Sequence, residues 1–597
     1  SRDNMKFEYQ VSAELRATVL VGAGTGSNFV KTYNPPQFGN GGRTQNKGQV
    51  IRSSVRNLDY LNNNLLNYKK KLGKHKIDGL LGYTQQYKVM DRLQIQMRGY
   101  DEDHTGGANN IQAGTAFQNT RGRFNEQKRI GILSRLNYVY GNKYSFTASY
   151  RLDGNSRFGE DNRWGGFPSA AFAWTASNEN FLKNSKTINN LKWRVSYGQS
   201  GSSGVRNDNS RRELNVAYYN YGETDVTGYE NTVNVDPSLT WQRSAQFNSG
   251  IDASLLNNRV KFTVDAYLRQ TRDMLLEKPL PPSSGFDVRM ENSGDIDNWG
   301  LEFALNTVNI KANDFSWETN FTIAFDRSEV LDLGGVDFQL FNAKGMKEDN
   351  LILKVGENVG NWFGYQQAGI YDESDFDITR DENGYITSMS VKDGVAEDVG
   401  TVGTLIGDPK FEDINGDGQI TPDDRTIIAR AQPDFFGGIY NKFSYKNLSL
   451  GIMASFRYGN DVINGNRWRY TTAQKQNYNT LLENMNAWTP ENTNTLHPRY
   501  NTVDERLTSR HVEDGSFLRI NNISLRYNLL GSQLKKAFFD NIEFSVNLDN
   551  FFLITNYSGN DPETSVMGGR YKFLAQGLDY GAYPRTKNVR LGARINF

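Results

Sequence analysis

The chain ends with Asn588-Val589-Arg590-Leu591-Gly592-Ala593-Arg594-Ile595-Asn596-Phe597, in which every second side chain is apolar. Side chains of an extended strand point alternately to two faces, so the odd-numbered residues form an apolar face and the even-numbered residues a polar or small one. Strict period two over about ten residues is typical of a half-buried β-strand. The segment therefore predicts a strand with one apolar and one polar face.

The same alternation recurs along the chain and indicates about 18 strands. Clear examples cover residues 144–152, 260–265, 315–325, 448–457 and 542–549. The connections alternate between short and long, and the short ones contain residues that hairpin turns require. The short turns include Leu72-Gly73-Lys74, Gly141-Asn142, Asn257-Asn258 and Lys446-Asn447. The long loops fall near residues 92–124, 201–238, 367–436, 459–512 and 556–582. Helical periodicity is nearly absent, and one short helix is expected at 479–488.

Composition narrows the class of protein. The 597 residues carry 68 Lys and Arg against 67 Asp and Glu, and this net charge of +1 removes the electrostatic case for a nucleic-acid partner. No apolar run approaches the length of a transmembrane helix, but a barrel strand needs only alternate apolar positions. Aromatic residues make up 12%, glycines number 57 and Cys is absent. A chain without Cys suits an oxidising envelope compartment.

These patterns predict an all-β fold, a transmembrane antiparallel β-barrel with long extracellular loops, in which residues 1–597 form one barrel domain. Soluble sandwiches, propellers and lectins also use alternating strands. There is no repeat of about 40–50 residues, and a soluble barrel would leave the large apolar groups without a partner layer. We expect outward-facing Phe544, Val546, Leu450, Ile452, Ile595 and Leu591, and lumen-facing Ser545, Asn547, Ser449 and Arg594.

The two ends of the sequence carry separate expectations. Phe597 is the expected insertion signal, because an aromatic residue that closes an alternating strand resembles the signal by which outer-membrane barrels are recognised. Ser1-Arg2-Asp3-Asn4 is not followed by an apolar core, so the start predicts no signal peptide. We therefore expect a mature or truncated portion of a longer protein.

One stretch has the spacing of a calcium-binding loop. Residues 413–424 read Asp-Ile-Asn-Gly-Asp-Gly-Gln-Ile-Thr-Pro-Asp-Asp. A twelve-residue calcium loop places oxygen ligands at positions 1, 3, 5, 7, 9 and 12, with Gly at position 6. The predicted ligands are Asp413, Asn415, Asp417, the Gln419 carbonyl and Asp424, with Thr421 through water. Position 12 is Asp in place of the usual Glu, and this shorter side chain should weaken calcium binding or lower the coordination number. No helix pair flanks the loop, so we expect a structural Ca²⁺ and not a regulatory EF-hand. The alternative is an Asx- and Gly-rich turn that holds no ion.

The arrangements that catalysis needs are missing. The four His residues, at 75, 104, 497 and 511, form no pair at metal-binding i, i+4 spacing. No G-x-S-x-G elbow is present. Val19-Leu-Val-Gly-Ala-Gly-Thr-Gly26 looks like the start of a dinucleotide site, but the following residues cannot form the long helix that such a site requires. The sequence therefore predicts no enzyme.

The long loop at 459–512 is rich in aromatic residues and Asn. Aromatic faces with amide donors suit stacking on sugar rings or gripping a peptide backbone. Candidate substrate or lid contacts are Trp468, Tyr470, Tyr478 and Trp488. The alternative is that these side chains pack the loop on itself or against a partner protein.

Several segments, in this order, resemble the SusC/RagA-type TonB-dependent transporters of the outer membranes of Bacteroidota. The segments that carry the resemblance are 144–158, 162–169, 191–201, 411–418, 424–428, 433–435, 559–563 and 583–586. They span most of the chain. Among them, Phe411-Glu-Asp-Ile-Asn-Gly-Asp-Gly418 is especially specific.

The resemblance implies a 22-stranded barrel with an N-terminal plug. About four strands, the plug and the TonB-box peptide are then expected to lie outside this chain. It also implies import of oligosaccharides or peptides, a SusD-like surface lipoprotein as a lid, and contact with TonB through the plug region. The resemblance also allows a dimer of two barrel–lipoprotein pairs. The alternatives are a structural subunit of an outer-membrane protein assembly complex and a passive pore.

Overall fold

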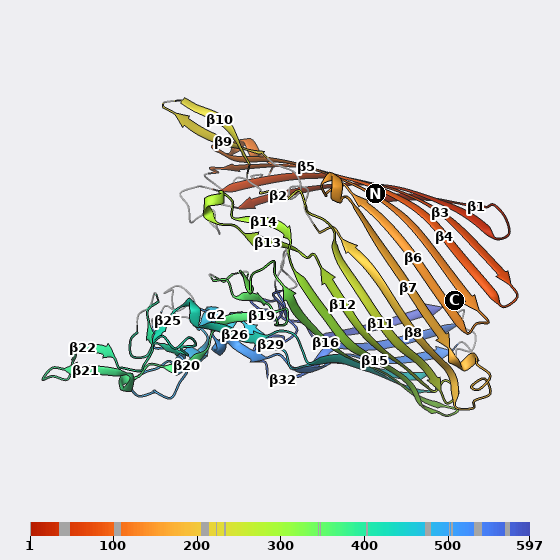
Figure 1. Cartoon of the computed structure of the whole chain (residues 1–597). Helices are drawn as coiled ribbons and strands as arrows, with labels where there is room; N and C mark the ends of the chain where they lie inside the picture. The colour runs from red at the N-terminus through yellow and green to blue at the C-terminus, as the bar shows by residue number, and fades with distance from the viewer. Residues whose placement is uncertain are drawn as a thin grey trace. The chain divides into compact units, whose positions relative to one another are not determined.

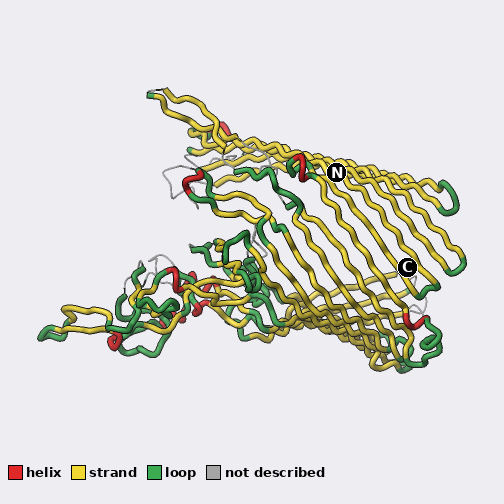
Figure 2. Tube along the Cα trace, in the orientation of Figure 1, coloured by secondary structure: helices red, strands yellow, loops and turns green. Residues whose placement is uncertain are grey.

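The computed structural model describes residues 2–596, apart from 35–47, 101–108, 205–213, 223, 232–233, 344, 347, 401–403, 472–478, 501, 503–504, 531–539 and 567–573. Strands dominate this part of the chain, and the helical segments are short turns within the loops (Figure 2). Helix α2, for example, spans Gly465–Tyr470. No described helix is long and apolar enough to cross a membrane. Phe597 and Tyr478 lie outside the described residues.

The main sheet contains seventeen strands, close to the number expected from the sequence. The chain divides into two compact units, and three of these strands contribute residues to both. These three are β8 (Ile188–Ser202), β11 (Gln242–Leu255) and β12 (Val260–Arg272). The remaining fourteen strands form two antiparallel meanders, one in each unit.

The first unit holds a meander in which each strand pairs with the next along the chain. Its strands are β1 (Arg2–Gln10), β2 (Leu15–Asn34), β3 (Gln49–Leu72), β4 (His75–Arg98), β5 (Ala116–Tyr140), β6 (Tyr144–Asn155) and β7 (Trp164–Thr175). Figure 1 shows β3 to β7 running side by side. Strands β3, β4 and β5 are 24 to 25 residues long, well beyond the 9–11 residues that cross a bilayer. Two hairpins, β9–β10 (Leu214–Tyr221 and Thr224–Asn231) and β13–β14 (Leu275–Pro279 and Val288–Asn292), also belong to this unit.

The second unit holds a meander of seven strands. They are β15 (Asp295–Lys311), β16 (Phe315–Asp332), β27 (Phe435–Tyr445), β28 (Leu448–Tyr458), β31 (Phe517–Leu530), β32 (Asn541–Thr555) and β34 (Asn588–Asn596). Paired residues form an apolar row across all seven strands: Ile310, Trp317, Phe443, Leu450, Leu525, Val546 and Leu591. Gly451, Ser524, Asn547 and Arg590 pair across the opposite face. The alternation predicted from the sequence is therefore confirmed here.

The short turns have the backbone conformation that the sequence predicts. Gly73, Gly141, Asn142, Asn257 and Lys446 all adopt positive φ, between 50° and 58°. Two-residue hairpin turns need this left-handed conformation because it matches the twist of the flanking strands. Gly73, Gly141-Asn142 and Lys446 lie in turns between neighbouring strands of the two meanders, and Asn257 lies in the turn between β11 and β12.

The long connections of the second unit form a loop module, which comprises the described residues of 333–434, 459–516 and 556–587 (Figure 1). Its described residues contain five small sheets. They are built from β17 (Phe338–Phe341), β18 (Leu351–Lys354), β19 (Asn361–Tyr365) and β26 (Arg425–Arg430); β20 (Gln367–Ile370) and β24 (Pro409–Phe411); β21 (Phe376–Arg380) and β22 (Ile386–Val391); β23 (Glu397–Asp398) and β25 (Gln419–Ile420); and β29 (Asp461–Asn464) with β30 (Val512–Asp514) and with β33 (Leu578–Asp579).

Residues 574–580 close the loop module from far along the chain. Strand β33 pairs in parallel with β29, and Leu578 and Asp579 have no exposed surface. The indole nitrogen of Trp362 donates to the Gln576 carbonyl at 2.9 Å, joining residues 214 positions apart. The module is therefore held by long-range contacts and not by any one loop alone.

Candidate functional site

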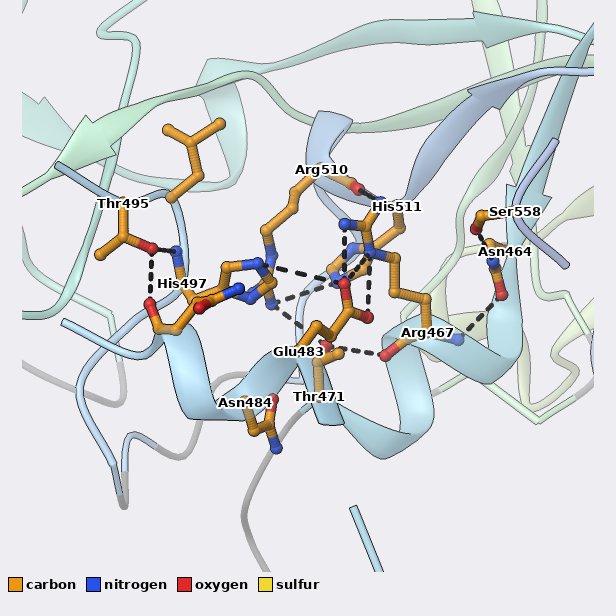
Figure 3. A network of polar contacts seen from close by, with 12 residues as sticks. Asn464, Arg467, Thr471, Glu483, Asn484, Thr495, His497, Arg510, His511 and Ser558 are labelled. Atoms are coloured by element: carbon orange, nitrogen blue, oxygen red, sulfur yellow. Dashed lines mark hydrogen bonds and ion pairs between the residues drawn. The ribbon is translucent and has the colours of Figure 1, made fainter. Parts of the chain in front are cut away.

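The candidate site lies in the loop module, where strand β29 leads into helix α2 (Figure 3). The Asn464 side chain accepts the backbone N–H of Arg467 at 2.9 Å and caps the helix. Its amide nitrogen donates to Glu513 at 2.9 Å, so the cap is itself tied to β30. This arrangement fixes the direction in which α2 presents Arg467, Trp468 and Tyr470.

Arg467 and Glu483 form a forked ion pair that connects α2 to the next described stretch of the loop. Arg467 Nε lies 2.9 Å and 3.1 Å from the two Glu483 oxygens, and Nη2 lies 2.8 Å from Oε2. Such bidentate pairs fix orientation as well as distance. The 3₁₀ turn Leu482–Asn486 is held in this way, within the region where the sequence predicts a short helix.

Two imidazoles lie on either side of the Arg510 guanidinium. Arg510 is 3.3 Å from His497 Nδ1 and 3.4 Å from His511 Nε2. Burial holds the pKa of His511 well below its usual range, and the charges of Arg510 and Arg467 lower it further. Burial also lowers the pKa of His497, again helped by Arg510. Both rings are therefore neutral at physiological pH.

Two buried carboxylates anchor the other wall of the site. Asp408 accepts Arg499 Nε at 2.9 Å and the Thr502 hydroxyl at 2.8 Å. Asp398 accepts Arg506 at 2.6 Å and 3.2 Å.

Arg506 also joins the wall to a small apolar cluster. Its guanidinium lies 4.5 Å from the ring centre of Phe411 and 5.1 Å from that of Tyr365. Phe411, Tyr365 and Ile420 pack together as a buried cluster. Burial raises the pKa of Tyr365 to about 12, so its hydroxyl stays neutral.

These groups enclose a loop pocket with a cavity of about 30 Å³, the space of about one water molecule. Its lining is polar and mostly paired internally. The lining residues are Gln367, Pro409, Thr471, Asn484, Ala487, His497, Pro498, Arg499, Tyr500, Thr502, Arg506, Thr508, Arg510 and His511. A pocket this small holds no oligomer.

The surface of the module carries three exposed apolar side chains that sequence reasoning missed, and we call them the apolar rim. Leu482 is 79% exposed, Met485 80% and Tyr500 67%. Leu482 and Met485 share the 3₁₀ turn whose Glu483 is held by Arg467, and exposed apolar groups that lie together in this way suit a surface that another protein covers. Leu482 and Met485 stand out in the sequence as apolar residues in an Asn-rich stretch, which is the pattern that could have identified them.

The aromatic residues predicted as substrate or lid contacts differ in how far they are exposed. Trp468 is buried and donates its indole N–H to the Glu505 carbonyl at 3.0 Å, so it packs the loop on itself. Trp488 is half-buried, and its ring packs where a side chain on Gly407 would lie. Tyr470 is 41% exposed and remains a candidate contact. The structure thus favours the packing alternative for Trp468.

The predicted calcium loop is closed by its own hydrogen bonds. Asp413 accepts the N–H groups of Gly416 and Gly418 at 2.7 Å and 2.8 Å. Asp424 is fully buried and accepts N–H groups from Ile414 at 2.9 Å and Thr421 at 2.7 Å. Within the described residues, no three acidic or imidazole groups converge on a metal position. The calcium site therefore stays a prediction.

Comparisons with known proteins agree with this fold. Residues 2–386 match the family model described as TonB dependent receptor-like, beta-barrel. TonB-dependent receptor P3 of Formosa agariphila is 32% identical over 549 residues, which are 90% of this chain and 52% of that protein. TonB-dependent receptor SusC of Bacteroides thetaiotaomicron is 28% identical over 619 residues, covering 100% of this chain and 55% of that protein. The structure of the RagAB peptide transporter superposes with a TM-score of 0.80 at 23% identity, over 100% of this chain and 61% of that one.

The chain belongs to the TonB-dependent receptor family, as a SusC-like outer-membrane β-barrel. The fold class and the outer-membrane location predicted from the sequence are confirmed. The family is not enzymatic, in agreement with the prediction of no enzyme. The chain spans about half the length of the curated relatives it matches.

Proposed function

We propose that this chain is the barrel of a TonB-dependent importer that takes up oligosaccharides or peptides with a SusD-like surface lipoprotein on its loop module. The observation that carries the proposal is the exposed apolar rim of Leu482, Met485 and Tyr500 on a base fixed by Arg467–Glu483. A rim of this kind suits a lid protein. Resemblance to SusC and to RagAB, a peptide transporter, supports the same reading.

Two alternatives differ in what the loop module does. In a structural subunit of an assembly complex, the module would hold other proteins permanently and no cargo would cross. A passive pore would need neither lid nor TonB. Uptake that depends on both the lipoprotein and TonB favours the importer over both alternatives.

The lid proposal is tested on the full-length receptor in its native membrane. Leu482→Asp combined with Met485→Asp places two charges on the rim, and we expect the lipoprotein to be lost during affinity purification in mild detergent. Leu482→Met combined with Met485→Leu keeps the apolar surface and is the control, with full recovery expected. Recovery of the lipoprotein at parental level with the charged variant contradicts the docking surface.

The transport proposal needs a separate readout. Cells that carry the charged rim variant should lose growth on the oligomeric nutrient that the system imports, while growth on the monomer stays normal. Growth on the oligomer that is unaffected by removal of TonB would contradict active import and favour a passive pore.

We also propose that residues 413–424 bind one structural Ca²⁺. The alternating oxygen side chains support it, since hard oxygen ligands suit this ion. Asp424 already connects the two ends of the loop by accepting N–H groups from Ile414 and Thr421. A bound ion would strengthen this connection.

A further inference from the structure

The first unit contains a second, larger hollow, on the polar face of strands β4 to β6. Its volume is about 570 Å³, within the range of ligand-binding pockets. The lining residues are Thr84, Gln86, Arg129, Ile130, Gly131, Arg151, Asp153, Gly154, Arg157, Gly201, Ser202, Ser203, Gly204 and Trp241. We call it the arginine pocket, because its charged groups are three guanidiniums and one carboxylate.

Strand register places these side chains on one face. Gln86 pairs with Arg129, and Thr84 pairs with Gly131, which in turn pairs with Asp153. Cross-strand partners share a face of the sheet. The opposite face of the same strands carries exposed apolar groups such as Ile132, Leu136 and Phe146, which is the face that meets lipid. The arginine pocket therefore opens to the inside of the barrel.

Arg151 is held in place by one of its nitrogens. Its Nε donates to Asp153 Oδ2 at 2.6 Å, and its side chain stays 44% exposed. Within the described part of the chain, neither of the two terminal amino groups of Arg151 has a hydrogen-bond partner. Gly131 makes room for the pair, because a Cβ there would lie 2.6 Å from Asp153 Oδ1 and 2.8 Å from Arg151 Nη2. A guanidinium oriented in this way presents two parallel N–H donors, the geometry that oxyanions accept.

The floor of the arginine pocket is rigid. Trp241 packs with Phe158, Phe167, Leu239 and Met290 in a buried cluster and donates its indole N–H to the Arg163 carbonyl at 3.1 Å. A Cβ on Gly201 would lie 2.0 Å from Phe167, so only glycine lets the 201–204 backbone close over this ring. Ser203 adds a hydroxyl group to the wall, and its oxygen accepts hydrogen bonds from the Asn155 amide at 2.7 Å and from Arg129 at 3.5 Å.

We propose that the arginine pocket binds a carboxylate or sulfate group of the cargo, so that the imported oligomer is anionic. Arg151, with Arg129 and Arg157 nearby, supplies the charge, and Gln86, Thr84 and the Ser202–Ser203 hydroxyls suit neutral hydroxyl or amide groups beside the anion. The lining holds three guanidiniums and one carboxylate, so its net positive charge favours an anion over a neutral maltose-type oligomer. This proposal rests on the import function proposed above and specifies its substrate class.

The test measures binding to the full-length receptor with its lipoprotein, purified in detergent. The probes are hexagalacturonate, a sulfated galactan hexamer, a hexapeptide of Asp and Gly, and uncharged maltohexaose. We expect one of the three anionic probes to bind, and the probe that binds identifies the source of the anionic group. Arg151→Gln and Arg129→Gln should each weaken that binding about tenfold, the usual effect of losing one charge-assisted hydrogen bond.

Two further variants keep the result interpretable. Arg151→Lys retains the charge but not the fork, so binding should fall less than with Arg151→Gln. Arg135→Gln removes a charge from the same face of β5 outside the arginine pocket, and it should leave binding unchanged. Heat-modifiable gel mobility checks that each variant forms a folded barrel.

Binding and uptake together separate the two proposals. A receptor that takes up maltohexaose and binds no anionic probe overturns the arginine pocket proposal and leaves import intact. Anion binding that is unaffected by Arg151→Gln and Arg129→Gln overturns it as well. If binding to the purified receptor depends on Arg151 but cells take up none of the probes, the arginine pocket proposal is upheld and the import proposal is contradicted.

Discussion

Arg519 of strand β31 and Asp561 of the loop module form an ion pair of 2.6 Å in which both side chains are buried. Glu563 lies 2.9 Å from Arg519 Nε, and Arg585 lies 2.9 Å from Asp561, so four charges form one network. The network fastens the chain segment after β32 to the sheet. A buried pair of this kind is costly to break, because one partner alone leaves an uncompensated charge.

Arg519→Met should loosen the 556–566 segment. The change leaves Asp561 buried without its closest partner, and we expect the free energy of local opening to fall by about 3–5 kcal/mol. Hydrogen exchange of the 556–566 amides measures this. The control is Arg585→Met, whose side chain is 44% exposed, and for which we expect about 0–1 kcal/mol. Equal effects of the two variants would contradict the importance of burial.

Acidification should loosen the loop module through His511. Its pKa in the folded state lies well below the ordinary 6.5 because the ring is buried. The open state therefore binds more protons between these two pKa values, so stability is lost as the pH falls below about 6.5. His497 contributes with the same sign. Hydrogen exchange of residues 505–514 at pH 7.5 and pH 5.5 measures the change.

His511→Gln is the control for this pH effect, because it removes the titrating ring but keeps a polar side chain. The difference in exchange between the two pH values should shrink in this variant. Asp461 and Asp579 act with the opposite sign, since burial raises their pKa values. An undiminished pH difference in the variant would assign the effect to other groups.

A charge on the apolar row should block barrel assembly. Val546 pairs with Leu525 and Leu591 within the row, whereas its neighbour Asn547 pairs with Ser524 and Arg590 on the polar face. Val546→Arg should cost about 2–4 kcal/mol on the lipid face, and Asn547→Arg should be tolerated. Yields of heat-modifiable folded barrel report the outcome, and equal yields would refute the assignment of faces.

Removal of the predicted calcium ligands should loosen the 367–436 loop and leave the sheet folded. Asp413→Ala combined with Asp417→Ala removes two oxygen arms, so calcium should no longer protect this loop from trypsin. Asp393→Ala, in the same loop but outside the predicted ligand set, should retain the protection. Identical digestion of the parent protein with calcium and with a chelator would contradict the site.

The strands and turns were predictable because their determinants are local. Alternation places Val546 and Asn547 on opposite faces whatever lies beyond them, and Gly141-Asn142 marks a turn because few residues tolerate positive φ. The count of strands followed from the same local pattern, but the long loop predicted at 92–124 is too wide, because β4 continues to Arg98 and β5 begins at Ala116.

The sites were less predictable because they depend on residues far apart in sequence. Trp468 was a candidate contact, but the Glu505 carbonyl, 37 residues away, draws it into the interior. The arginine pocket was not foreseen either, because only the register of β4, β5 and β6 brings Gln86, Arg129 and Asp153 together. Pairing across strands supplies information that a pattern within one strand does not contain.

The bond from Trp362 to the Gln576 carbonyl makes the loop module depend on a segment close to the final strand. Its two partners are 214 residues apart, and contacts so distant form late because the intervening chain must first be ordered. The hairpins join residues that are close in sequence, whereas the loop module cannot close until residues 574–580 are in place. Competence to engage a partner would thus follow completion of the barrel, so that unfinished chains do not recruit a lid.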